Sequence, residues 1–151
     1  MDNNGQNHSK NSALIHFLGT IDELNSHLGL VKVLICGDEN KQFLEGIQKK
    51  LMKIMSHIVE PANENYLINY EEITVLEEEI DKHKKTLPEL SGFVLPGSSA
   101  AEAQIHIART VARRAERYFF AVTGYEICQI AGEYLNRLSN YLFILSQKEN
   151  Y

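Results

Sequence analysis

The sequence predicts an all-α protein, a single five-helix antiparallel bundle. Apolar residues recur at spacings of three and four in five separate segments, which is the period of a helix with one buried face. Clusters of glycine, proline and small polar residues separate these segments, and most of the connections are short. The chain shows no convincing pair of strands and no internal repeat. Helices joined by short connections pack as antiparallel neighbours, so the bundle follows.

Composition limits the classes of function. A chain of 151 residues with 44% hydrophobic and 23% charged residues is an ordinary globular domain. A net charge of −5 argues against general nucleic-acid binding, although a local cluster of arginines can still bind an anion. The spacing of Cys36 and Cys128 does not indicate a disulfide framework, and we expect buried or idle thiols in a reducing compartment. The absence of a signal peptide and of a long apolar run predicts a cytoplasmic protein without a membrane partner.

The first segments of the chain divide into a tail and a helix. Residues 1–11 are polar and lack periodicity, and we expect a disordered tail followed by one domain over residues 12–151. The first helix should run from Ser12 to Ile35. Its apolar stripe consists of Leu14, Phe17, Ile21, Leu24, Leu28, Val31 and Ile35.

The second and third helices follow a break at Cys36–Asp38. The second is expected over Asn40–Val59, ended by Pro61, and its inward residues are Phe43, Ile47, Leu51, Ile54, Met55 and Ile58. Asn69 and Glu72 have the spacing of an N-terminal capping pair, so a third helix should begin there and end near Lys85. Its inward residues are Ile73, Leu76 and Ile80.

Two more helices are expected in the second half of the chain. Residues 86–99 contain two prolines and two glycines and read as a loop. Ser99 and Glu102 predict a capping box that starts the fourth helix, which should end near Gly124. The fifth helix is expected over Glu126–Lys148, and its inward residues are Ile130, Tyr134, Leu135, Leu138, Leu142 and Leu145.

The fourth helix carries the most informative pattern, because Ile105–Arg117 contains four arginines on one amphipathic segment. At about 100° per residue, a narrow polar stripe collects Glu102, His106, Arg109, Arg113 and Glu116. The other side collects Ala108, Val111, Ala112, Ala115, Phe119 and Val122. The polar stripe can present guanidinium donors to phosphate or carboxylate. It can equally be a solvated face with ion pairs one turn apart.

Two further polar stripes lie beside glycines. Asp22 shares a helix face with Gly19 and Gly29, and Asn136 and Asn140 lie beside Gly132. Glycine costs a helix roughly 1 kcal/mol relative to alanine, so these positions hint at close approach by a ligand or another chain. Simple exposure to water is expected instead for Lys49, Lys50, Glu77, Glu78 and Lys84.

Five blocks occur in an order that resembles a known family. They are Gly19–Leu30, Leu76–Asp81, Phe93–Gly97, Ala108–Arg117 and Tyr134–Phe143. Together they are similar to the PduO-type ATP:corrinoid adenosyltransferases. The resemblance implies a five-helix bundle that assembles as a homotrimer with active sites between subunits. It also implies transfer of the 5′-deoxyadenosyl group of ATP, supplied with Mg²⁺, to the cobalt of reduced cobalamin, with release of triphosphate.

The resemblance also implies roles for individual residues. Arg113 would bind phosphate, and Arg109 would pair with Asp22 of a neighbouring subunit. Glu116 and Asn136 would fix the nucleotide and the arginines.

Phe93 would press on the lower face of the corrin, whereas without the resemblance a buried plug in the loop would be the better reading. No protein side chain is expected to bind a metal. The six histidines form no Glu-x-x-His set of the kind that di-iron bundles use.

Three departures from the family pattern support a rival function. Family members begin with a phosphate loop of the form TxxGDxGxT, and no such segment occurs in residues 1–17 of this sequence. Ser98 replaces a loop glycine, and Asn140 replaces an aspartate. We therefore expect weak ATP binding. The alternative function is a catalytically weak or inactive paralogue that binds corrinoid or a partner protein, the candidates being a cobalamin reductase or a cobalamin-dependent enzyme.

Overall fold

The computed structural model describes residues 3–90, 92–123 and 129–149, with side chains described from Ser12 onward apart from Thr123. Within these ranges the chain forms five α-helices, one short 3-10 helix and no strand, so the all-α prediction is confirmed. The elements are α1 (Asn3–Leu34), α2 (Asp38–Val59), η1 (Glu64–Tyr66), α3 (Tyr70–Lys84), α4 (Ala100–Thr123) and α5 (Gln129–Lys148). None of the described helices is long and apolar enough to cross a membrane.

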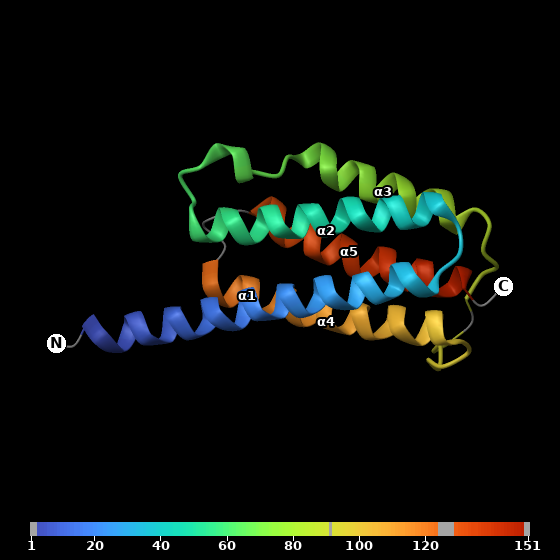
Figure 1. Ribbon diagram of the computed structural model, residues 1–151, viewed down its shortest axis with the longest axis horizontal. Coiled ribbons are helices and arrows are strands. Elements are labelled where there is room, and N and C mark those ends of the chain that lie inside the picture. Colours follow the sequence, from blue (N-terminus) through green and yellow to red (C-terminus); the bar gives the residue numbers. More distant parts are fainter. Residues whose placement is uncertain (1–2, 91, 124–128, 150–151) are drawn as a thin grey trace.

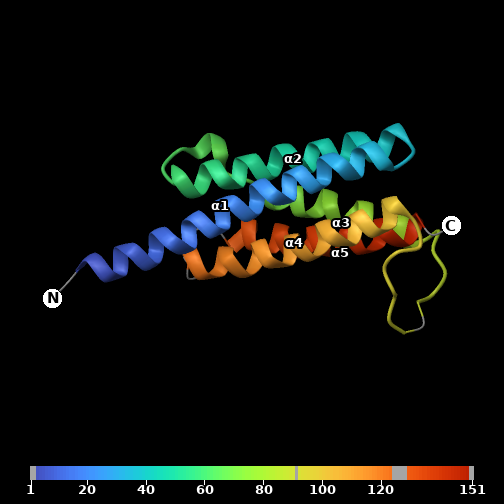
Figure 2. The same cartoon turned by 60° about the horizontal axis from the view of Figure 1, so that its bottom comes forward.

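The five helices lie along one long axis, and each runs opposite to the one before it (Figure 1). Helix α4 packs between α1 and α5, while α2 packs on α1 (Figures 1 and 2). These three contacts are antiparallel, as predicted. Helix α3 packs on α5, and the two helices run in the same direction. Because successive helices alternate in direction, two odd-numbered helices that become neighbours are parallel. This contact brings the polar residues of α3 beside those of α4 and α5.

Helix α1 begins at Asn3 rather than at Ser12, so residues 3–11, assigned above to a disordered tail, are helical. Extending an existing helix adds a backbone hydrogen bond for each residue without a new nucleation cost. These turns project beyond the end of the bundle (Figure 2). A polar composition and a missing apolar stripe therefore did not exclude a helical backbone.

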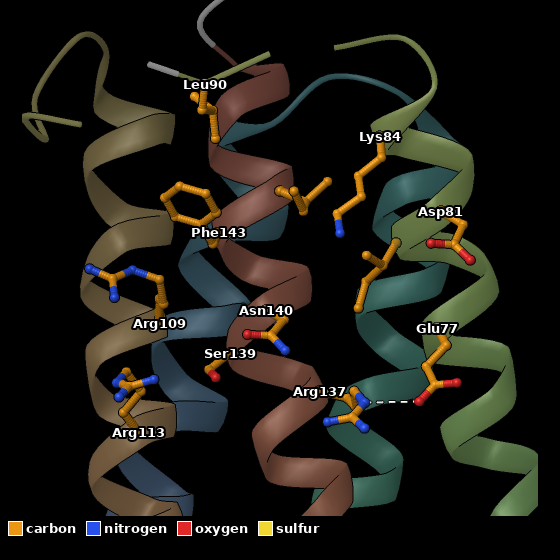
Figure 3. A pocket seen from close by; sticks show the side chains of 12 residues that line it. Glu77, Asp81, Lys84, Leu90, Arg109, Arg113, Arg137, Ser139, Asn140 and Phe143 are labelled. Atoms are coloured by element: carbon orange, nitrogen blue, oxygen red, sulfur yellow. Dashed lines mark hydrogen bonds and ion pairs between the residues drawn. The ribbon is translucent and has the colours of Figure 1, made fainter. Parts of the chain in front are cut away.

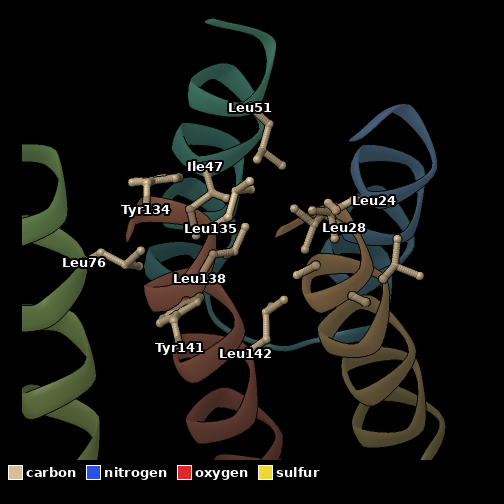
Figure 4. Close-up of a cluster of buried hydrophobic side chains, with 14 of the residues drawn as sticks. Leu24, Leu28, Ile47, Leu51, Leu76, Tyr134, Leu135, Leu138, Tyr141 and Leu142 are labelled. Atoms are coloured by element: carbon tan, nitrogen blue, oxygen red, sulfur yellow. The ribbon is translucent and has the colours of Figure 1, made fainter. Parts of the chain in front are cut away.

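The core is formed by the predicted apolar stripes of all five helices (Figure 4). Complete burial of one leucine or isoleucine contributes about 1.5–3 kcal/mol, so this core dominates the stability of the bundle. Five residues predicted to face inward are only partly buried, namely Leu14, Phe43, Met55, Val122 and Ile130. The buried side chains that were not predicted include Leu44, His57, His83 and Tyr141.

The helix boundaries follow local chemistry. Gly37 has a φ of +92°, which few residues other than glycine adopt, and α2 begins directly after it with Asp38 and Glu39 at its positive end. The Asn69–Glu72 capping box is present at the start of α3. The predicted cap Gly124 and the thiol Cys128 lie outside the described residues, and Cys36 is exposed rather than buried.

Gly132 is required by helix packing within the chain. A Cβ atom at this position would lie 3.0 Å from Cζ of Phe120 and 3.1 Å from Cε1 of Phe119. Its smallness therefore lets α5 approach α4, and the close approach comes from this chain's own phenylalanines. Around Gly19, by contrast, nothing lies within 4 Å of the position a Cβ would take.

Candidate functional site

A cavity of about 690 Å³ lies between α3, α4 and α5 (Figure 3). All three helices contribute polar residues to its wall, and Ile80, Leu90, Phe143 and Ile144 add apolar surface. The lining residues are Glu77, Ile80, Asp81, Lys84, Leu90, Arg109, Arg113, Arg137, Ser139, Asn140, Phe143 and Ile144. A space of this size is in the range of small-molecule sites.

Helix α4 contributes two of its four arginines to the cavity. Arg109 and Arg113 are four residues apart and therefore share one face of the helix (Figure 3). Burial and the charge of Arg113 lower the pKa of Arg109 from its ordinary value, yet a guanidinium remains charged at neutral pH. Arg114 faces elsewhere, and its Nη2 donates to both carboxylate oxygens of Glu23 on α1, at 2.9 and 2.8 Å. Arg109 and Arg113 thus face the cavity, as the helix wheel grouped them, whereas Arg114 links α4 to α1.

The start of α4 holds a buried carboxylate. Glu102 has an exposed fraction of 0%, and its Oε2 accepts hydrogen bonds from the backbone N–H groups of Gly97 (2.7 Å) and Ser98 (3.0 Å). Its own N–H donates to Oγ of Ser99 at 3.0 Å, which is one half of the predicted capping box. Burial opposes ionisation of Glu102, but the two backbone donors and His106 outweigh it and hold the pKa of the carboxyl below its ordinary value.

His106 lies between Glu102 and the cavity arginine. Its Nε2 is 3.0 Å from Oε1 of Glu102, and its Nδ1 accepts a hydrogen bond of 3.3 Å from Nε of Arg109. The ring is 4% exposed and packs edge-on against Phe143, with 6.3 Å between centroids. Burial lowers the pKa of His106, and the charge of Arg109 lowers it as well. The Glu102 carboxylate acts in the opposite direction but does not outweigh them. Two members of the polar stripe are therefore buried, and a purely solvated face is excluded for them.

A chain of hydrogen bonds crosses from α4 through α5 to α3. Asn136 Nδ2 donates to Oε1 of Glu116 at 3.2 Å, and Arg137 Nη1 donates to Oδ1 of Asn136 at 2.8 Å. Arg137 Nε donates to Oε1 of Glu77 at 2.8 Å. Glu77 was expected to be merely solvated, and this expectation is wrong because α3 packs beside α5. Lys84 likewise lines the cavity.

Lys50 also departs from the expectation of simple exposure. Its Nζ lies 2.7 Å from Oε1 of Glu72, so it links α2 to α3. Lys49 and Glu78 are exposed, as expected. The helix wheel had given all of these residues an outward position, and the packing of neighbouring helices decided which of them meets a partner on another helix.

The structure brings together some of the predicted site residues and not others. Arg109 and Arg113 line the cavity, and Glu116 and Asn136 are bonded to each other beside it. Asp22 lies exposed on α1 and does not line the cavity. Phe93 is fully exposed in the loop between α3 and α4, so the alternative of a buried plug is wrong.

Sequence reasoning missed Arg137 and the cavity face of α3. Glu77, Asp81 and Lys84 are spaced by four and three residues, which places all of them on one helical face. This spacing was a usable signal, and the position of Arg137 directly after Asn136 was another. Within the described residues, no group of three or more His, Cys, Asp or Glu side chains is placed to hold a metal ion.

Comparison with known proteins identifies the family. The fold and the cavity define an all-helical bundle with a candidate small-molecule site that two arginines of α4 and one of α5 line. The model of the family described as cobalamin adenosyltransferase matches residues 2–149. This chain therefore belongs to the cobalamin adenosyltransferase family.

Individual relatives agree with this assignment. The corrinoid adenosyltransferase PduO of Citrobacter freundii is 38% identical over 97% of this chain, which spans only 45% of that protein. The corrinoid adenosyltransferase of Bacillus subtilis is 35% identical over 93% of this chain and 76% of the relative. A variant PduO-type ATP:corrinoid adenosyltransferase from Lactobacillus reuteri, solved with cobalamin and ATP, superposes with a TM-score of 0.83. It is 34% identical, and the match covers 94% of this chain and 80% of that one.

Proposed function

We propose that this protein is an ATP:corrinoid adenosyltransferase, which transfers the 5′-deoxyadenosyl group of ATP to the cobalt of reduced cobalamin. The observation that carries the proposal is the pair Arg109 and Arg113 on the wall of a cavity of about 690 Å³. The solved relative from Lactobacillus reuteri holds cobalamin and ATP together. An arginine pair on the wall of such a cavity suits the phosphates of ATP.

The reaction needs positioning and charge stabilisation more than an acid or a base. Reduced cobalt donates its electron pair to C5′ of ATP, the C5′–O bond breaks, and the triphosphate leaves with the bonding electrons. The protein has to align C5′ with cobalt and stabilise the charge of the leaving group. Arg113, which is exposed on the cavity wall, is suited to bind phosphate because its charge is permanent and its donors are arranged as a fork.

Glu116 and Asn136 act beside the arginines in this proposal. Their mutual hydrogen bond of 3.2 Å links α4 to α5 and leaves acceptor capacity on the Glu116 carboxylate for nucleotide hydroxyl or amino groups. Mg²⁺ enters with the phosphates of ATP, which supply oxygen ligands of the kind that this ion prefers. This arrangement would fix the nucleotide relative to the helix that carries Arg113.

Phe93 is the proposed contact to the corrin. It is fully exposed, and Leu95 beside it is 89% exposed, so the loop presents apolar surface that folding of the single chain does not cover. A flat apolar macrocycle would cover it. An aromatic side chain below cobalt excludes water and a lower ligand, which is an apolar and steric task.

We further propose a homotrimer in which Asp22 meets Arg109 of a neighbouring subunit. Asp22 is exposed on α1 and does not line the cavity of its own chain, so it would meet Arg109 of another copy rather than its own. Light scattering on the purified chain tests this. A monomer with a helical circular dichroism spectrum would exclude the intersubunit site.

The proposed activity is tested by anaerobic turnover. Chemically reduced cobalamin and MgATP are mixed with the protein, formation of the cobalt–carbon bond is followed by absorbance, and triphosphate is detected by ³¹P NMR. The expected result is equal amounts of alkylated cobalamin and triphosphate. Calorimetric binding of cobalamin without turnover would favour the non-catalytic alternative, and no binding of either substrate would contradict both functions.

A further inference from the structure

Glu102 and His106 form a buried pair at the start of α4, and this pair makes more contacts than helix capping requires. A cap is complete when a side-chain oxygen accepts from the first free N–H groups, and Ser99 already provides this at 3.0 Å. Glu102 is nevertheless fully buried and bonded to Gly97 and Ser98, in the loop that also carries Phe93. A buried carboxylate without a role beyond capping is costly to retain.

The same pair reaches the cavity on its other side. His106 stands 3.0 Å from the second oxygen of Glu102 and accepts from Arg109 at 3.3 Å. A guanidinium Nε–H can only donate, so Nδ1 of His106 has to be its unprotonated nitrogen. The neutral ring then carries its proton on Nε2, which faces the carboxylate. Phe143, which lines the cavity, packs on the ring edge and restricts its rotation.

We propose that Glu102 and His106 are positioning residues that hold the guanidinium of Arg109 in the cavity and connect it to the Gly97–Ser98 end of the Phe93 loop. The inference rests on the proposed function and names two further residues for it. Each link is a hydrogen bond or close polar contact between described side chains, and three of the four groups are on one helix. Displacement of the loop would therefore shift the arginine, and loss of the arginine contact would release the ring.

The first test reads the connection directly and does not depend on activity. Long-range ¹H–¹⁵N NMR on the full chain reports the protonation of each histidine ring nitrogen, and the His106→Asn variant assigns the signal. The charged groups that face this ring are Glu102 and Arg109 on its own helix, while α5 presents the uncharged Phe143. We expect a neutral ring protonated at Nε2 at neutral pH, and a change in its nitrogen shifts in Arg109→Met. A ring protonated at Nδ1, or one indifferent to Arg109→Met, would overturn the proposal.

The second test compares kinetic parameters in folded variants. Glu102→Gln keeps the shape of the side chain but removes the charge that binds two backbone donors, so it should change the KM for cobalamin as well as kcat. His106→Phe retains a ring but not the acceptor for Arg109, so it should lower kcat with little effect on the KM for cobalamin. Misplacement of a reacting group by about 1 Å can cost about a hundredfold, and we expect at least about a tenfold loss of kcat in both.

Gln104→Leu is the matched control, since Gln104 is buried on the same helix but donates to His27 on α1. It should leave both parameters near the wild-type values. Wild-type kinetics in Glu102→Gln and His106→Phe would overturn the positioning role while the transferase assignment stands. An inactive wild-type protein would contradict the proposed function, and the NMR measurement would still decide whether the connection exists.

Discussion

Arg109 and Phe93, two of the proposed site residues, differ in how they are held. Arg109 belongs to a set of buried polar contacts that runs from Ser98 through Glu102 and His106. Phe93 lies only a few residues before this set and is fully exposed. Folding of the single chain thus fixes the position of Arg109, whereas Phe93 presents its aromatic ring to water.

This difference shows which side chain the folded chain positions by itself and which one needs a ligand to cover it. Hydrogen bonds made inside the folded chain position a charged group before a ligand arrives, so no further ordering cost falls on binding. An exposed phenylalanine gains its contact only when something apolar covers it. We therefore expect substitutions on the arginine wall to act on nucleotide binding and substitutions of Phe93 to act on the corrin step. Four predictions follow this division, from the largest expected effect to the smallest.

Arg113→Ala should produce the largest change on the arginine wall. A charge-assisted hydrogen bond contributes about 1.5–3 kcal/mol, so MgATP affinity should fall about 10- to 150-fold. Isothermal titration calorimetry measures the change. Lys49→Ala is the control, because Lys49 is exposed on α2 and does not line the cavity. Equal and negligible effects of both substitutions would mean that the stripe is only solvated.

Phe93→Asp should slow transfer to cobalamin while leaving ATP affinity nearly unchanged. Burial of a large apolar side chain against a ligand is worth about 1.5–3 kcal/mol, so the rate should fall about tenfold or more. Phe93→Leu should retain more activity than Phe93→Ala, and Asp should retain least. Stopped-flow absorbance of cobalamin follows the rate, and thermal unfolding should be unchanged because the ring is exposed. Wild-type turnover by Phe93→Asp would remove the assigned role.

Acidification should weaken folding in two stages. Burial holds the pKa of His83 and His106 below the ordinary value of 6.5, so below about pH 6.5 the unfolded chain takes up protons that the folded chain resists. Stability should therefore fall first between about pH 7 and pH 5.5. Although burial works against it, the pKa of Glu102 is also lowered, and its stabilising contribution is present above 4.5 and lost as pH falls through its folded value.

Urea midpoints at about pH 7.5 and about pH 5.5 measure the first stage. The double variant His83→Gln, His106→Gln should flatten the difference, whereas the exposed His16→Gln should keep it. A double variant as sensitive to pH as the wild type would show that other groups control the acid response.

The Arg137–Glu77 pair should contribute least to stability. Both side chains are more than a third exposed, and such pairs typically contribute less than about 1 kcal/mol. A double-mutant cycle with Arg137→Met and Glu77→Gln, followed by urea unfolding, measures the coupling free energy. A much larger coupling would show that the chain of contacts through Asn136 is cooperative, and α3 would then help to fix the arginine wall of the cavity.

Some parts of the site could be predicted from the sequence because they depend on residues a few positions apart. The i to i+4 spacing of Arg109 and Arg113 placed both on one helix face, and the structure agrees. The Asn69–Glu72 capping box likewise depends only on local geometry. The extension of α1 to Asn3 was missed because a polar segment without an apolar stripe gives no periodic signal, whereas helix propagation depends on the turn that follows.

By itself, the sequence determined the helical class, most of the core face of each helix and the register of the arginine stripe, because a period of about 3.6 residues is written locally in the chain. The tertiary structure alone decided which polar residues meet. Glu77 reaches Arg137 because α3 packs parallel to α5, and Glu102 is buried because the loop folds over the start of α4. These contacts depend on the relative rotation and register of separate helices, which arise from packing of the whole core and not from the spacing within any one segment.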